Sequence, residues 1–306
     1  MFGRGQRGTG QGGQGAEGPT VLFGLGVTKA GTSWLFRYLS GHPDGRQRRV
    51  KECHFFNTLE GTAPGHHEAA LVGRAADLRA RLAQGDLTAA ARSRLRAEVE
   101  DVESFLAVLR GADPAAHLAW LVQDAGPGQV VADITPAYGR LPPARLAQMA
   151  ALSPATRFVY LMREPVARLW SHARMIARRR LAQGGVAEAH ARAAMEQALD
   201  GQAAHIRDAG DHAAQLPRIE SAIPSARLLV GFFEDLFRPG LPERICAFLG
   251  IRPHPAPVSA RIHEGLAIPL PADLARRATV ALRPQYDFVA ARGPVPDAWA
   301  RRFAEG

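Results

Sequence analysis

Two lysines stand out among the residues that could do chemistry. The chain has 38 Lys and Arg residues, and only Lys29 and Lys51 are lysine. Lysine carries a compact ammonium on a flexible stem, whereas arginine carries a planar fork, so the two are not interchangeable. Lys29 lies in a glycine-containing segment, and Lys51 directly precedes Glu52. The pattern indicates one ammonium placed to bind a negatively charged group and one beside a carboxylate that can accept a proton.

The segment around Lys29 predicts a phosphate-binding turn. Residues 20–27, TVLFGLGV, are apolar and β-prone, which predicts a buried strand. Residues 28–33, TKAGTS, form a polar turn, and apolar residues from Trp34 then recur at helical spacing until about residue 41. A helix that begins at such a turn offers free backbone N–H groups to a phosphate. The order differs from a Walker A loop, in which Ser or Thr directly follows Gly-Lys.

A second anion-binding pattern follows a later strand. Residues 157–162, RFVYLM, predict a strand, and Pro165 is typical of a helix start. Arg163 lies between the two elements, and Ser171 lies two helical turns further on. An arginine fork and a serine hydroxyl on one loop could together hold a phosphate.

These segments together resemble the PAPS-dependent sulfotransferases, where PAPS is 3′-phosphoadenosine 5′-phosphosulfate. Residues 29–34, KAGTSW, are similar to the family's 5′-phosphosulfate loop, and residues 163–171, REPVARLWS, are similar to its 3′-phosphate motif. The resemblance covers roughly residues 20–56 and 129–171. It implies PAPS as donor and these cofactor-binding residues: Lys29, Ala30, Gly31, Thr32, Ser33, Trp34, Arg163 and Ser171.

Residues 51–56, KECHFF, are similar to a stretch of the glycan (heparan-type) sulfotransferase branch and its bacterial relatives. The resemblance implies that Glu52 is the general base and that Lys51, with Lys29, stabilises charge on the leaving phosphate. Sulfuryl transfer, like phosphoryl transfer, needs positioning and electrostatics more than covalent chemistry, so no metal is expected. His42 and His54 are alternative bases, because other sulfotransferase branches use histidine.

Residues 133–138, DITPAY, are similar to a third family segment. That segment usually carries an acidic residue followed by lysine, but Ile134 follows Asp133 here. The departure argues against a heparan-like acceptor. Asp133 could orient the base, bind the acceptor or cap a turn.

Strands at 20–27, 129–134, 157–162 and 227–233 alternate with helical segments. This order predicts an α/β, P-loop-like three-layer fold with a central parallel sheet and helices on both faces. Residues 66–124 predict a helical insertion of two or three helices, and residues 187–222 predict a further helical stretch. Residues 252–306 show little pattern. Ligands of such sheets bind at the carboxyl ends of the strands, where both loops belong.

Composition sets broader limits. The chain has 306 residues, 46% of them hydrophobic, which allows one domain at 19–306 after a Gly-rich tail at 1–18. A net charge of +9 suggests anionic partners. No apolar run is long enough to span a membrane and no secretion signal is recognisable, so we expect a cytoplasmic protein. Cys53 and Cys246 form no metal-binding pattern.

Two other function classes remain open. An ATP-dependent P-loop phosphotransferase would need a metal-binding carboxylate after a strand, and Asp133 is the one candidate. A nucleic-acid-binding protein would fit the charge, but no binding motif is recognisable, so we expect no nucleic-acid partner. The acceptor could be a carbohydrate, a lipid or a small molecule. The arginines at 178–180 are interpreted as a solvated helix face.

Overall fold

The computed structural model describes residues 18–256 and 266–304. A four-stranded parallel sheet with strand order β2-β1-β3-β4 forms its centre. The strands are β1 (Thr20–Gly26), β2 (Val130–Ile134), β3 (Thr156–Met162) and β4 (Leu228–Phe232). The two central strands, β1 and β3, are almost wholly buried, as expected for strands covered by helices on both faces. The predicted α/β fold is confirmed.

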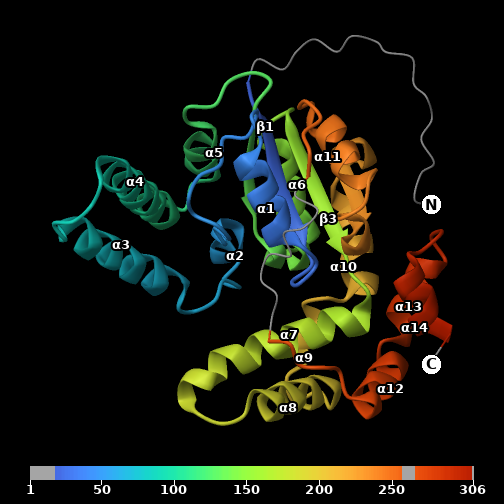
Figure 1. Ribbon diagram of the computed structural model, residues 1–306. Coiled ribbons are helices and arrows are strands. Elements are labelled where there is room, and N and C mark those ends of the chain that lie inside the picture. Colours follow the sequence, from blue (N-terminus) through green and yellow to red (C-terminus); the bar gives the residue numbers. More distant parts are fainter. Residues whose placement is uncertain (1–17, 257–265, 305–306) are drawn as a thin grey trace.

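Helices cover both faces of the sheet (Figure 1). On one face lie α1 (Thr32–Gly41) and α11 (Leu241–Leu249), joined where the Tyr38 hydroxyl meets the Cys246 thiol at 3.0 Å. On the other lie α6 (Pro143–Ala151) and α10 (His212–Ala222). This arrangement buries nearly all of β1, β2 and β3, whereas three of the five residues of β4 are only half-buried.

A third group of helices lies across the carboxyl ends of the strands. The longest is α7 (Pro165–Arg180), which packs on α8 (Ala187–Leu199) and α9 (Ala204–Asp208) (Figure 1). The short helix α2 (Phe55–Leu59), which the sequence pattern did not predict, lies near the same edge. Phe55 and Phe56 on α2 are fully buried and belong to the hydrophobic core.

The remaining helices extend the domain at both sides. The helices predicted between 66 and 124 are α3 (His67–Ala83), α4 (Ala89–Gly111) and α5 (Pro114–Val122), and α3 and α4 form a projecting antiparallel pair. The stretch predicted at 187–222 is divided into α8, α9 and α10. The C-terminal part, which shows little sequence pattern, contains α12 (Ala272–Ala281), α13 (Arg283–Ala290) and α14 (Asp297–Ala304).

Two expectations concern parts of the chain that the structure describes incompletely. Within residues 18–256 and 266–304, no helix combines the length and apolarity that a bilayer crossing requires. The expected Gly-rich tail lies, apart from Gly18, outside the described residues.

Candidate active site

The turn between β1 and α1 is tightly built. Lys29 and Gly31 both have left-handed backbone conformations, with φ values of 74° and 87°. A Cβ atom on Gly31 would lie 2.5 Å from Leu236 Cδ1 and 2.9 Å from Phe233 Cδ2, so this position requires glycine. No side chain caps α1, which leaves the N–H groups of its first turn without partners from the helix itself. The turn therefore has the geometry of an anion-binding helix N-terminus.

The remaining predicted residues of this turn have buried or half-buried side chains. Ala30 is fully buried, and its N–H donates to Val27 O at 3.1 Å. Thr32 is buried and Ser33 half-buried at the start of α1. The indole ring of Trp34 is buried and stacks on Tyr38 at 5.1 Å between ring centroids. The Trp34 side chain therefore belongs to the core.

The two predicted anion motifs meet. Arg163, in the turn between β3 and α7, donates from Nη1 to the carbonyl oxygen of Lys29 at 2.9 Å. Its guanidinium also lies over the Phe233 ring, 4.3 Å from the centroid. Residues 134 positions apart in the sequence therefore form one cationic surface at the carboxyl edge of the sheet. Ser171 is half-buried on α7, in the second turn beyond Arg163.

Lys29 lies in a strongly positive environment. Burial lowers the pKa of its ammonium to about 8, and positive charge from three arginines adds to the effect: Arg163, Arg178 and Arg174. The negative charge of Glu52 acts in the opposite direction, which places the predicted base near Lys29. A bound anion would relieve this repulsion, because it would supply the negative charge that the site lacks.

Lys51 and Glu52 form an ion pair, with Lys51 Nζ 2.6 Å from Glu52 Oε1. Their side chains are 29% and 41% exposed, so the pair faces solvent. Glu52 and His54 both have left-handed backbone conformations, with φ values of 58° and 51°. Such conformations cost energy in residues other than glycine and often occur at functional sites. Of the five non-glycine residues with positive φ in the described chain, three lie in this site: Lys29, Glu52 and His54.

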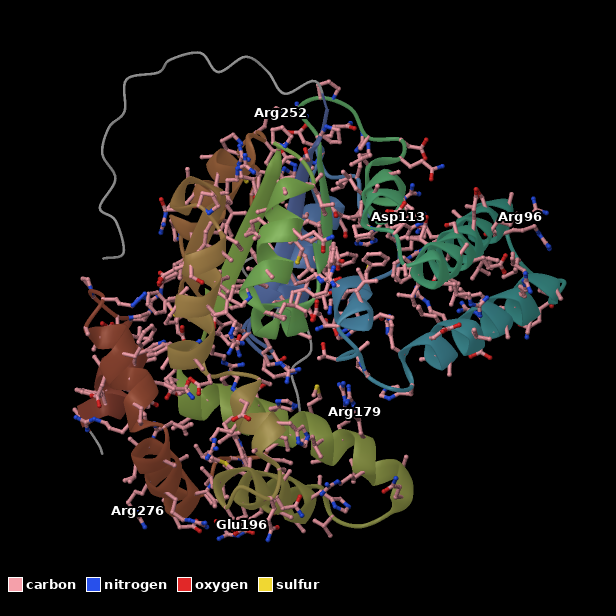
Figure 2. All side chains as sticks on the ribbon, turned by 180° about the vertical axis from the view of Figure 1, so that it is seen from behind. Arg96, Asp113, Arg179, Glu196, Arg252 and Arg276 are labelled. Carbon is pink, nitrogen blue, oxygen red and sulfur yellow. The ribbon has the colours of Figure 1, made fainter. Side chains whose placement is uncertain are left out.

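The two histidine candidates lie in different places. His54 follows Glu52 closely, and its Nδ1 lies 3.2 Å from Asn57 Oδ1. His42 lies just beyond the far end of α1 and is bound through Nε2 to Arg252 O at 2.9 Å. Arg252 lies at the opposite end of the sheet from Arg179 on α7 (Figure 2). His42 is therefore too distant from the predicted site to act as the base. Of the two histidines, His54 remains as an alternative base.

Asp133 does not face the site directly. It is 1% exposed, and its carboxylate accepts hydrogen bonds from Thr135 Oγ1 at 2.7 Å and the Tyr138 hydroxyl at 2.6 Å, with His117 Nε2 at 3.2 Å. Burial alone would raise its pKa, but the hydrogen bonds from these three partners lower it overall. Thr135 Oγ1 in turn accepts the backbone N–H of His54 at 3.4 Å. Asp133 thus anchors the Glu52 segment and has no surface left for an acceptor.

Ile134 has a packing explanation. It pairs in register with Gly24 on the neighbouring strand, and a Cβ atom on Gly24 would lie 2.7 Å from Ile134 Cγ2. The side chain fills the space over this glycine and is 1% exposed. An apolar residue is therefore suited to this position, where the glycan branch usually has lysine.

Several residues that shape the site carry no sequence signal. Glu164 caps α7 by accepting the N–H groups of Val166 and Ala167, and its carboxylate also accepts the Tyr286 hydroxyl. Glu234 accepts the backbone N–H of Glu164 at 2.9 Å. The one sequence signal for Glu164 is its position directly after Arg163. Partners 70 or more residues away could not be found from spacing.

Comparison with known proteins agrees with this geometry. The model of a sulfotransferase family matches residues 19–255, which is most of the chain. The chain belongs to the sulfotransferase family. No curated protein sequence matches it significantly.

One solved structure supports the fold of this sulfotransferase. A sulfotransferase from Alicyclobacillus acidocaldarius is similar with a TM-score of 0.59 and 22% identity, over 92% of this chain and 98% of that one. The sulfotransferase domain from the curacin biosynthetic pathway matches with a TM-score of 0.42 and 17% identity, over 85% of this chain and 77% of that one. At these identities, the first likeness supports the shared fold alone and the second carries no argument.

Proposed function

We propose that this sulfotransferase moves a sulfuryl group from PAPS to an acceptor hydroxyl or amine. The observation that carries the proposal is the contact between the two anion motifs, in which the Arg163 guanidinium donates to the Lys29 carbonyl at 2.9 Å. A donor with phosphate groups at both ends of its ribose needs two cationic sites on one surface, and this contact supplies them. The helix N-terminus at Thr32 would bind the 5′-phosphosulfate, and Arg163 with Ser171 would bind the 3′-phosphate.

The proposed transfer is a single in-line displacement. The acceptor oxygen or nitrogen forms a bond to sulfur while the bond from sulfur to the bridging oxygen of the 5′-phosphate breaks, and 3′-phosphoadenosine 5′-phosphate (PAP) leaves. Glu52 takes the acceptor proton. Lys29 and Lys51 stabilise the negative charge that develops on the bridging oxygen. These two ammonium groups carry the charge stabilisation, so the proposal includes no metal ion.

The Lys51–Glu52 ion pair bears on this mechanism. At 2.6 Å, the Lys51 ammonium occupies one oxygen of the base. The phosphosulfate of a bound donor would compete for the same ammonium. Donor binding would thereby free the carboxylate for the acceptor proton and bring Lys51 to the leaving group.

The proposal is tested by thermal unfolding with nucleotides. PAP at 100 times its Kd is expected to stabilise the protein by about 2.7 kcal/mol, without metal. ADP and ATP, with or without Mg²⁺, should stabilise it much less. Arg163→Ala should abolish the PAP effect. Arg157→Ala, at the far end of the same strand, should retain it, because Arg157 donates only to nearby backbone carbonyls.

One outcome of the thermal unfolding experiment would contradict the proposal. Stabilisation by ATP with Mg²⁺ and none by PAP would support a P-loop phosphotransferase instead. The structure gives that alternative no support, because Asp133, the one candidate metal ligand, is enclosed by Thr135, Tyr138 and His117.

A further inference from the structure

The turn that carries Arg163 lies between two regular elements. The pairing of β3 with β4 ends at Met162, which pairs with Phe232, and α7 begins only at Pro165. The carbonyl of Arg163 therefore belongs neither to the sheet ladder nor to the helix. A backbone carbonyl in such a position needs a partner from elsewhere in the molecule.

His212 supplies that partner. It is the first residue of α10 and is fully buried. Its Nε2 lies 3.0 Å from the carbonyl oxygen of Arg163, and its Nδ1 lies 3.3 Å from the hydroxyl of Tyr160. A carbonyl can only accept, so Nε2 carries the hydrogen, and Nδ1 is then the acceptor for Tyr160. Burial lowers the pKa of His212 to about 4, which keeps the ring in this neutral form at neutral pH.

Arg163 is thus held at both ends. His212 fixes its backbone, and Lys29 O and the Phe233 ring fix its guanidinium. We propose that His212 is a positioning residue for donor recognition: by holding the Arg163 carbonyl it aims the guanidinium at the 3′-phosphate and sets the preference for 3′-phosphorylated nucleotides. The inference rests on the proposed function, because it assumes that Arg163 binds this phosphate.

The neighbouring supports use other hydrogen bonds, although the His212 and Tyr286 rings both pack on Trp299. Glu164 is held by Glu234 through its N–H and by Tyr286 through its carboxylate, and it caps α7 itself. Loss of the His212 bond therefore leaves the start of α7 in place. The expected consequence is a misdirected Arg163 side chain in an otherwise intact site, and displacements of about 1 Å are enough to reduce such interactions strongly.

The experiment compares two nucleotides on the full-length protein by titration calorimetry. PAP and AMP differ only in the 3′-phosphate, so the ratio of their Kd values measures recognition of that group. His212→Leu is expected to weaken PAP binding about tenfold and to leave AMP binding unchanged. His212→Gln should restore most of the ratio, because its amide N–H can reach the carbonyl. His212→Asn, which is too short, should behave like His212→Leu and serves as the second variant if the leucine variant does not fold.

The matched control is Gln215→Met, one turn further along α10. Gln215 is also buried and also donates to a backbone carbonyl, that of Asp208 at 2.9 Å. Like His212 it contacts the Tyr160 hydroxyl, at 3.5 Å, but it has no hydrogen bond to Arg163, so it isolates the bond to the Arg163 carbonyl. This control should lose comparable thermal stability and keep the wild-type ratio. An equal loss of PAP and AMP affinity in His212→Leu, or an unchanged ratio, would overturn the inference. A wild-type protein that does not distinguish PAP from AMP would instead contradict the proposed function, and the inference with it.

Discussion

The donor side and the transfer side of the site are built differently. On the donor side, Lys29 is surrounded by arginines, and Arg163 is fixed by contacts from the turn after β1, from α10 and from Phe233. On the transfer side, Lys51 and Glu52 are neighbours in sequence and pair with each other in a solvent-facing position. Arg163 is thus tied to distant parts of the chain, whereas Lys51 and Glu52 are tied to each other.

The difference has an electrostatic consequence. Charges in a partly buried site interact more strongly than exposed charges, because less water screens them. An exposed ion pair such as Lys51–Glu52 contributes little to stability, so its charges are available for chemistry. We expect the donor side, Lys29 included, to set nucleotide affinity, while Glu52 and the two lysines set the rate. The following predictions test that division, from the largest expected effect to the smallest.

Substitution of the base should have the largest effect on the rate. Glu52→Gln is expected to lower kcat by roughly 10²–10⁴-fold, because the acceptor proton loses its carboxylate, while PAP affinity stays unchanged or improves slightly. The measurement is PAP release from PAPS with an acceptor that the wild type uses. Glu60→Gln is the control, since Glu60 pairs with Arg145 beside the site. Near-wild-type turnover in Glu52→Gln would contradict the role of Glu52 and support His54 as the base.

The two lysines should respond differently to the same change. Lys29→Arg is expected to lose roughly 10²–10³-fold in kcat despite keeping its charge, because the larger fork does not fit the tight turn beside Gly31. Lys51→Arg, in an exposed position, should lose about tenfold or less. Both variants are assayed by PAP release under saturating PAPS. Equal losses in the two variants would contradict the contrast between Lys29, in its arginine-lined turn, and Lys51, in its solvent-facing ion pair.

The smallest effect is a pH dependence of donor affinity. The pKa of Lys29 is about 8, so its ammonium is protonated below that pH and progressively neutral above it. PAP affinity should therefore fall about twofold between pH 7 and 8 and approach a fall of about tenfold per pH unit above that, until the pKa of the bound lysine is reached. Calorimetric Kd values from pH 7 to 9.5 would show this. Lys29→Arg should bind with no such dependence in this range, and a slope that persists in that variant would assign the titration to another group.

The sequence by itself determined the elements and much of the local chemistry. Apolar runs such as residues 157–162 gave the strands, since their hydrophobic pattern reflects burial on both faces. The strand–turn–helix around Lys29 was also readable, because its turn residues and helical spacing are local properties. The short helix at Phe55 and the C-terminal helices from Ala272 were not, because short or proline-rich segments have little periodicity and depend on tertiary packing.

Only the tertiary structure decided which of these residues share a site. It brought Arg163 against Lys29, placed His42 at the opposite end of the sheet and buried Asp133 beneath the Glu52 segment. It also supplied His212, which no motif indicates. The physical reason is that hydrogen-bond partners are chosen by strand order and by the way helices pack across the strand ends. These depend on contacts between distant parts of the chain, which local sequence patterns do not encode.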